Sequence, residues 1–143
     1  MGSLQQSGRH LRRREQQALE AAALFGDNYY LLGRIWATTR NSRNGRACWQ
    51  ELRAITARRN LACRFGRWDI PGRPKVILVG YRDRFNQGQL LFSLWNRYGI
   101  DSISGGWDYV EPVMFSTACV EVIEAACQTI AVPATGPVLA HYH

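Results

Sequence analysis

The chain has 143 residues, of which 46% are hydrophobic and 20% charged, and its formal net charge is +7 at pH 7. This length and composition are typical of one globular domain and exclude an intrinsically disordered chain. The apolar runs are far shorter than the roughly 20 residues that a membrane-spanning helix needs, so we expect no membrane segment. We expect a globular domain over residues 9–132, after a disordered start or cloning remnant at 1–8 and before an extended tail at 133–143.

The charge is distributed unevenly along the chain. Residues 1–97 contain all 18 basic residues and six of the 11 acidic ones, a net charge of +12. Residues 98–143 contain the other five acids and no Lys or Arg, a net charge of −5. All but one of the cations are Arg, whose planar guanidinium can bind phosphate through two parallel hydrogen bonds. The basic region therefore favours a polyanionic partner.

The N-terminal part of the chain is predicted to be mainly helical. Apolar spacing predicts a helix over 9–25 and a second over 29–39, although Gly33 leaves a strand over 29–37 as the alternative. A third helix over 46–59 would carry a basic outer face.

The most apolar stretch follows a short predicted strand over 61–65 and a loop over 66–74 that is rich in Pro and Gly. Residues 75–81 include four consecutive β-branched or Leu side chains and are closed by Gly80. A continuous apolar run of this length is typical of a strand that is buried on both faces. We therefore predict that residues 75–81 form the central strand of a sheet.

Two further segments complete a strand, helix, strand pattern. A strong apolar helical face covers 90–98, and residues 100–104 read as a second short strand. This pattern predicts a partly parallel sheet. The fold class that we expect is α+β, a single domain with N-terminal helices, a small mixed sheet with a buried central strand at 75–81, and a C-terminal helix.

The C-terminal helix is expected over residues 116–130. Its spacing places Val120 and Cys127 on the inward face. The preceding residues, 109–115, contain Pro112, which would confine a strand there to a sheet edge.

Residue types that common catalytic and metal sites need are missing from the body of the chain. The three His residues are His10, His141 and His143, near the ends, which argues against Ser-His-Asp and Cys-His catalysis. The four cysteines form no C-x-x-C pair, so we expect reduced thiols of a cytoplasmic protein. No dinucleotide-binding or P-loop motif is present either. We expect no catalytic residues, no metal and no cofactor.

The strongest functional signal is a set of three consecutive basic elements: the loop 40–46, the helix 46–59 and the loop 66–75. If they share a face, they form a phosphate-binding surface with an aromatic side chain available for stacking. The predicted nucleic-acid-binding residues are Arg40, Arg43, Arg46, Arg53, Arg58, Arg67, Trp68, Arg73 and Lys75. We therefore expect a basic nucleic-acid-binding protein with a regulatory role, whose partner is DNA or RNA.

One version of this hypothesis is a winged helix, because three helices followed by a hairpin with a basic tip have that order. Two features argue against it. The loop 40–45 is longer than the usual turn between the two DNA-binding helices, and residues 76–79 are too apolar for an ordinary wing strand. A basic α+β domain with another binding geometry stays open.

Two other classes of function also stay open. A protein-interaction or inhibitor module would use Trp36, Trp68 and Trp107 together with several Arg, and the opposite charges of the two parts of the chain would suit a homodimer. A small ligand-binding α/β domain would instead bind its ligand where the central strand ends. The residues expected there are Tyr81, Arg82, Asp83 and Ser104.

Overall fold

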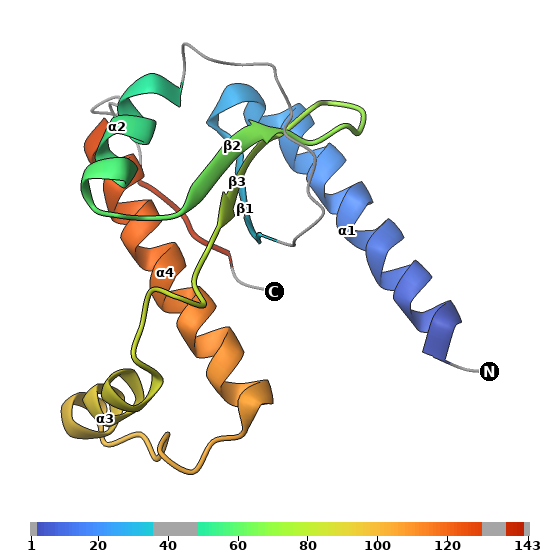
Figure 1. The fold of residues 1–143 in the computed structure, drawn as a ribbon. Coiled ribbons are helices and arrows are strands. Elements are labelled where there is room, and N and C mark those ends of the chain that lie inside the picture. Colours follow the sequence, from blue (N-terminus) through green and yellow to red (C-terminus); the bar gives the residue numbers. More distant parts are fainter. Residues whose placement is uncertain (1–2, 36–48, 130–136, 142–143) are drawn as a thin grey trace.

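A computed structural model describes residues 3–35, 49–129 and 137–141 of the chain. Its elements follow in the order α1 (Ser3–Phe25), the short 3-10 helix η1 (Gly26–Asn28), β1 (Tyr30–Arg34), α2 (Gln50–Arg58), β2 (Cys63–Arg67), β3 (Lys75–Val79), α3 (Gln87–Tyr98) and α4 (Trp107–Thr129) (Figure 1). The fold is α+β, as the sequence predicts, with helices at both ends of the chain and a small mixed sheet between them.

The sheet has the strand order β1-β3-β2, so β3 is the central strand. β1 runs parallel to β3 and places Leu32 beside Ile77, while β2 runs antiparallel and places Phe65 opposite the same residue. The predicted two-sided burial of β3 is only partly correct. Ile77 and Val79 on one face are buried, but Val76 and Leu78 on the other face are half-buried.

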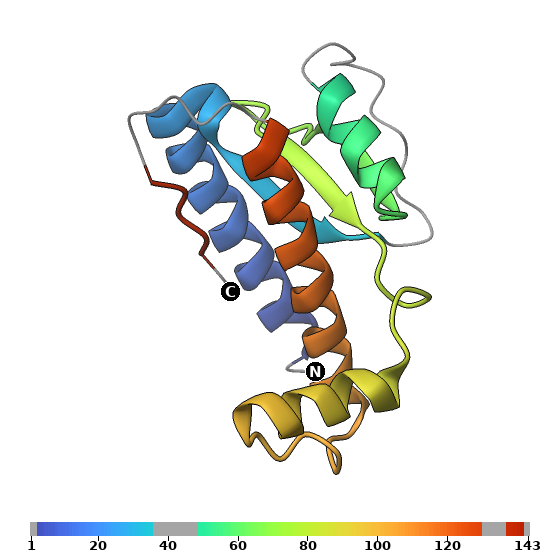
Figure 2. The ribbon, with the colours of Figure 1, turned by 90° about the vertical axis from the view of Figure 1, so that its left-hand side faces the viewer.

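The core lies between the buried face of the sheet and two helices, α2 and α4 (Figure 2). α4 supplies a stripe of buried side chains at the i, i+4 spacing of a helix face, from Val110 through Met114 and Ala118 to Val122. α2 adds Leu52, which is buried in the same cluster. β3 and α4 therefore form the framework on which the other elements are placed.

α1 joins this framework through its C-terminal part. Ala18 and Ala22 are buried there, and a Cβ atom built on Gly72, at the tip of the β2–β3 hairpin, would lie 3.3 Å from the Cβ of Ala22. Gly72 has φ +81°, a conformation that favours glycine. The N-terminal part of α1 extends beyond the sheet in Figure 1, and the helix begins at Ser3, within the expected disordered start.

Three predicted elements are wrong. In the segment 29–39, residues 30–34 form strand β1, so the alternative of a strand over 29–37 is correct there and the helix is wrong, because pairing with β3 overrides the helical spacing of the apolar residues. Residues 100–104 form a loop, in which buried Ser102 shares a hydrogen bond of 2.9 Å with the Tyr109 hydroxyl.

The C-terminal helix begins at Trp107 and not at residue 116. Pro112 is tolerated in its second turn, where the missing N–H leaves one backbone carbonyl without its helical partner on an exposed side. The inward face is also rotated from the prediction: Val120 and Cys127 are exposed, while Ala118 and Val122 are buried.

α3 is bounded as its sequence predicts. The Asn86 side chain accepts a hydrogen bond of 3.1 Å from the Gln89 backbone N–H, which caps the first turn. Gly99 ends the helix with φ +66°, and its N–H donates to the Trp95 carbonyl. Leu91 is buried against the core, while Leu90 and Leu94 are half-buried beside it. Both ends of α3 are therefore fixed.

The loop between α3 and α4 depends on Gly105. A Cβ atom at this position would lie 2.4 Å from Cδ1 of Tyr109, closer than real contacts. We expect Gly105→Ala to displace the Tyr109 ring and to lower the free energy of unfolding by about 1–3 kcal/mol. Chemical denaturation followed by circular dichroism measures this change.

Gly88 provides the matched control, because a Cβ there would meet only the Asn86 side chain at 3.6 Å. Gly88 lies in the first turn of α3, so Gly88→Ala should be neutral or stabilising by up to about 1 kcal/mol. Equal destabilisation by both substitutions would contradict the role given to Gly105.

Candidate functional site

The predicted phosphate-binding residues do not form a single cluster. Arg40, Arg43 and Arg46 lie outside the described residues. Arg53 and Arg58 lie on α2, and the remaining four lie on β2, the hairpin loop and β3. The described positions thus separate into an α2 group and a hairpin group.

Arg53 borders a hollow of about 400 Å³ between α2 and β2. Its guanidinium lies 5.4 Å from the centre of the Phe65 ring, a distance at which cation and aromatic face attract. Arg64, an exposed residue of β2, lines the same hollow. The other lining residues are Thr56, Ala57, Leu61 and Cys63. We call this site, with Arg53 on its helix side and Arg64 on its strand side, the basic hollow.

Arg64 was not among the predicted site residues. The signal that could have found it is the two-residue period of a strand, since Cys63 and Phe65 point to the core face and Arg64 to the other. Arg58 is not brought to the hollow, because five residues along a helix turn it about 140° away from Arg53. Its side chain is exposed, and its Nε donates to the Ala54 carbonyl of the same helix at 3.4 Å.

The hairpin group is organised around Asp27, which follows α1. Arg67 donates to the Asp27 carboxylate at 2.7 Å and to the Arg73 carbonyl at 3.0 Å. The hydrogen bond from Arg67 and the charges of Lys75 and Arg67 lower the pKa of Asp27. Arg67 therefore braces the root of the hairpin, although part of its side chain is still exposed.

The Lys75 side chain, which the sequence predicts to contact phosphate, is largely covered by other residues. Its side chain is only 9% exposed. The ammonium donates to the Asp27 carbonyl at 2.8 Å and to the Tyr30 hydroxyl at 3.3 Å, and it lies 4.9 Å from the centre of the Tyr30 ring. These contacts hold the ammonium inside the structure, and the role of Lys75 as a phosphate contact stays a prediction.

Trp68 and Arg73 lie on the hairpin loop itself. Trp68 is half-buried, and its backbone N–H donates to the Pro74 carbonyl at 3.0 Å. Arg73 is exposed and has φ +41°, in the left-handed region. Arg73 therefore presents a positive charge to solvent on this loop, and Trp68 contributes none.

Several other arginines are paired with acidic residues of α4. Arg59 lies 3.6 Å from Glu124, and Arg84 lies 2.8 Å from Glu121. Arg84 also donates to the backbone carbonyl of Arg59 at 3.0 Å. These cations join the α2 and β3 ends to α4 and are not available for a polyanion.

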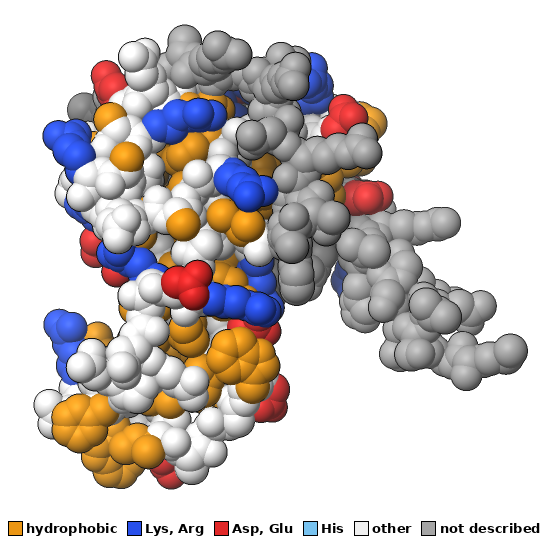
Figure 3. Space-filling view, viewed as in Figure 1, with side chains coloured by type: hydrophobic (Ala, Val, Ile, Leu, Met, Phe, Trp, Pro, Cys, Tyr) orange, Lys and Arg blue, Asp and Glu red, His pale blue; other side chains and the backbone are white. Residues whose placement is uncertain are grey.

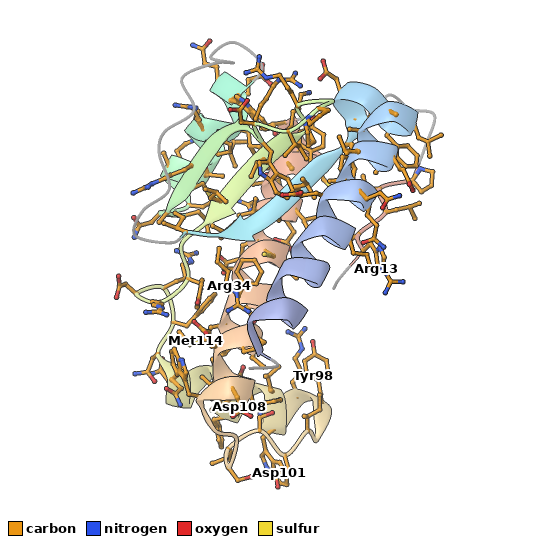
Figure 4. All side chains as sticks on the ribbon, turned by 90° about the vertical axis from the view of Figure 1, so that its right-hand side faces the viewer. Arg13, Arg34, Tyr98, Asp101, Asp108 and Met114 are labelled. Atoms are coloured by element: carbon orange, nitrogen blue, oxygen red, sulfur yellow. The ribbon has the colours of Figure 1, made fainter. Side chains whose placement is uncertain are left out.

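A second polar cluster lies where the parallel strands β1 and β3 end. The Glu111 carboxylate of α4 accepts hydrogen bonds from the Tyr81 hydroxyl and from Arg82, the latter at 3.1 Å. Arg34, at the end of β1, lies 3.3 Å from the other oxygen of this carboxylate. Figure 4 shows Arg34 directed toward α4, near Met114.

This cluster brings together Tyr81 and Arg82, two of the residues proposed for a ligand site. Ser104 is not part of it, since its hydroxyl donates to Asp101 at 3.4 Å in the α3–α4 loop. The hydrogen bonds from Tyr81 and Arg82 lower the pKa of Glu111. The carboxylate is therefore ionised at neutral pH. It already accepts from Tyr81 and Arg82, the hydrogen-bond donors that an anionic ligand would need.

The half-buried Cys63 and the buried Cys119 are poor candidates for nucleophilic chemistry. Burial raises the pKa of Cys63 to about 11 and that of Cys119 to about 11. Because the thiolate is the reactive form, both remain almost wholly protonated at neutral pH. Within the described ranges, no group of three or more His, Cys, Asp or Glu side chains is placed to hold a metal ion.

No helix in the described part of the chain has the length and apolar character that crossing a membrane requires. No protein-family model matches the chain, and a comparison with curated proteins finds no significant match.

The Glu111 cluster predicts a pH dependence of stability. A carboxyl group whose pKa is lower in the folded state stabilises the fold above its ordinary pKa of 4.5, and this contribution is lost as the pH falls through the folded value. We expect Glu111→Gln to lower the free energy of unfolding clearly at pH 7. The difference from the unsubstituted protein should shrink as the pH falls below about 4.5.

The control is Glu124→Gln, which changes an exposed carboxylate of the same helix that lies 3.6 Å from Arg59. Exposed ion pairs contribute little, so this substitution should change stability by less than about 1 kcal/mol. Denaturant titrations at several pH values measure both effects. A Glu111→Gln difference that stays constant from pH 7 to pH 3 would exclude the assigned role.

Proposed function

We propose that this protein binds nucleic acid through the basic hollow, with Arg53 and Arg64 as the central phosphate contacts. The observation that carries the proposal is the placement of these two residues: they come from different elements and border the same surface depression. Arg58 and Arg73, on α2 and the hairpin loop, are exposed and would serve as additional contacts further along the surface.

The pairing of the other cations supports this choice of surface. Arg34, Arg59 and Arg84 have acidic partners within 4 Å, whereas Arg53, Arg58 and Arg73 have none among the described residues. A cation without an internal counter-charge gains most from a phosphate, because binding then releases condensed counterions without breaking an existing ion pair.

The residues that border the hollow are suited to the backbone of a nucleic acid. Arg53 and Arg64 border it, and guanidinium groups bind phosphate in a fixed planar geometry. Leu61 and Phe65 also line it but are buried, so the proposal rests on phosphate contacts and not on base stacking. Binding of this kind is led by the backbone, so the proposal covers both DNA and RNA.

The binding geometry differs from that of a winged helix, because β1 replaces the second helix and pairs parallel with β3. In our proposal α2 and β2 contact the nucleic acid together. Arg40, Arg43 and Arg46 stay predictions from the sequence, as do a regulatory role and a cytoplasmic location.

The small-ligand alternative is weaker, because Glu111 already accepts hydrogen bonds from Tyr81 and Arg82 and forms an ion pair with Arg34. The protein-interaction alternative is favoured by a separate surface on α3, which is treated below.

The test is a comparison of binding between the unsubstituted protein and the double variant Arg53→Ala/Arg64→Ala. Fluorescence anisotropy with labelled single-stranded DNA, duplex DNA and RNA of about 20 nucleotides, at several salt concentrations, gives the affinity and its salt dependence. The slope of log K against log salt is negative, and each lost phosphate contact should reduce its magnitude by about 1. The magnitude for the double variant should therefore be smaller by about 2.

Arg13→Ala is the matched control, because Arg13 is an exposed residue of α1 that lies away from the hollow (Figure 4). It should leave the slope nearly unchanged. If the unsubstituted protein binds none of the three probes at low salt, or if the control loses as much slope as the double variant, the proposal fails.

A further inference from the structure

A second surface has a different character from the basic hollow. It consists of α3, the loop to α4 and the first residues of α4, over residues 87–108, and we call it the aromatic lobe. Large apolar side chains are between 46% and 61% exposed on it: Phe92, Trp95, Tyr98, Ile100, Ile103 and Trp107. Figure 3 shows large hydrophobic side chains at this end of the molecule, with most of the visible Lys and Arg side chains above it.

The lobe is a fixed surface and not a loose segment. α3 packs inward through Leu91, its two ends are capped, and the loop is closed by the hydrogen bond between Ser102 and Tyr109. Phe92 and Trp95 are three residues apart, so they lie on the same outward side of the helix. Exposed apolar side chains of this number on one short segment are typical of an interaction site.

The charges of the lobe decide which partner it fits. Arg97, Asp101 and Asp108 are exposed, and none has an oppositely charged partner within 4 Å among the described residues. Acids outnumber cations here, so the lobe is unsuited to nucleic acid and to an anionic lipid surface. It carries both signs of charge beside an apolar centre.

We propose that the aromatic lobe binds the aromatic lobe of a second copy of this chain, in a two-fold symmetric dimer. In such an interface each patch contacts its own equivalent, so one patch must be complementary to itself. The lobe meets this condition: the apolar side chains of the two copies cover one another, and Arg97 of each copy faces the acidic side chains of the other. The dimer does not depend on nucleic-acid binding, because the basic hollow lies at the opposite end of α4 (Figure 1).

The test uses the charges, since they distinguish a lobe that binds itself from a lobe that binds another protein. In Arg97→Asp all three charged positions of the lobe become acidic, and in the double variant Asp101→Arg/Asp108→Arg all three become basic. Each variant alone should be monomeric, because like charges then face one another. A mixture of the two should form a mixed dimer, because opposite charges are restored across the interface.

Analytical ultracentrifugation at about 10–100 μM gives the mass of each sample, and circular dichroism melting verifies that each variant is folded. The unsubstituted protein should be a dimer with at least tenfold tighter association than either charge variant. A monomeric unsubstituted protein over this range, or a mixture that stays monomeric when both variants are folded, would overturn the proposal.

A second measurement tests the apolar part of the same interface. Trp95→Ser should weaken the dimer at least tenfold, whereas Leu24→Ser, at a 79% exposed position of α1, should not. Trp95→Ser should also retain nucleic-acid binding if that activity exists, so the two proposals can fail separately. Equal dimerisation by the unsubstituted protein and Trp95→Ser would exclude the lobe as the interface.

Discussion

The Glu111 carboxylate connects α4 to the ends of the parallel strands β1 and β3. It accepts hydrogen bonds from Tyr81 and Arg82, which follow the central strand, and pairs with Arg34 at the end of β1. Two separate segments thus meet on one side chain of α4. This contact adds to the packing of the buried face of α4 on the sheet, and α4 in turn contacts α2 at one end and α3 at the other. A neutral or shorter side chain at 111 would leave two guanidinium groups without their counter-charge.

The same principle explains the charge asymmetry of the chain. Three of the five acids in the C-terminal part, Glu111, Glu121 and Glu124, pair with arginines from the N-terminal part. Most acids of the C-terminal part are therefore paired within the molecule, and the chain keeps its excess charge of +7. Among the described residues, Arg53, Arg58 and Arg73 have no acidic partner within 4 Å, and Asp101 and Asp108 have no basic one. In our proposals, this division separates the surface for a polyanion from the surface for a protein.

Local signals were sufficient for the central strand and for α3. The run at Lys75–Val79 is apolar on both faces and flanked by turn residues, and Gly99 ends α3 by its left-handed conformation. The errors came from non-local contacts. β1 is a strand because β3, 45 residues later, pairs with it. Arg53 and Arg64 could be found one by one in the sequence, but their shared hollow depends on how α2 packs. Burial of Lys75 depends on Asp27, 48 residues earlier.

α4 contains 23 residues and runs from the aromatic lobe to the end of α2 without a break (Figure 2). At 1.5 Å per residue, it is a strut about 34 Å long. In a lobe-to-lobe dimer the two basic hollows would be held apart by two such struts. The assembly would then be bivalent: a short oligonucleotide reaches one hollow, whereas a long strand reaches both and gains affinity through effective concentration. The length of this helix would thus determine the length of nucleic acid that the dimer binds most tightly.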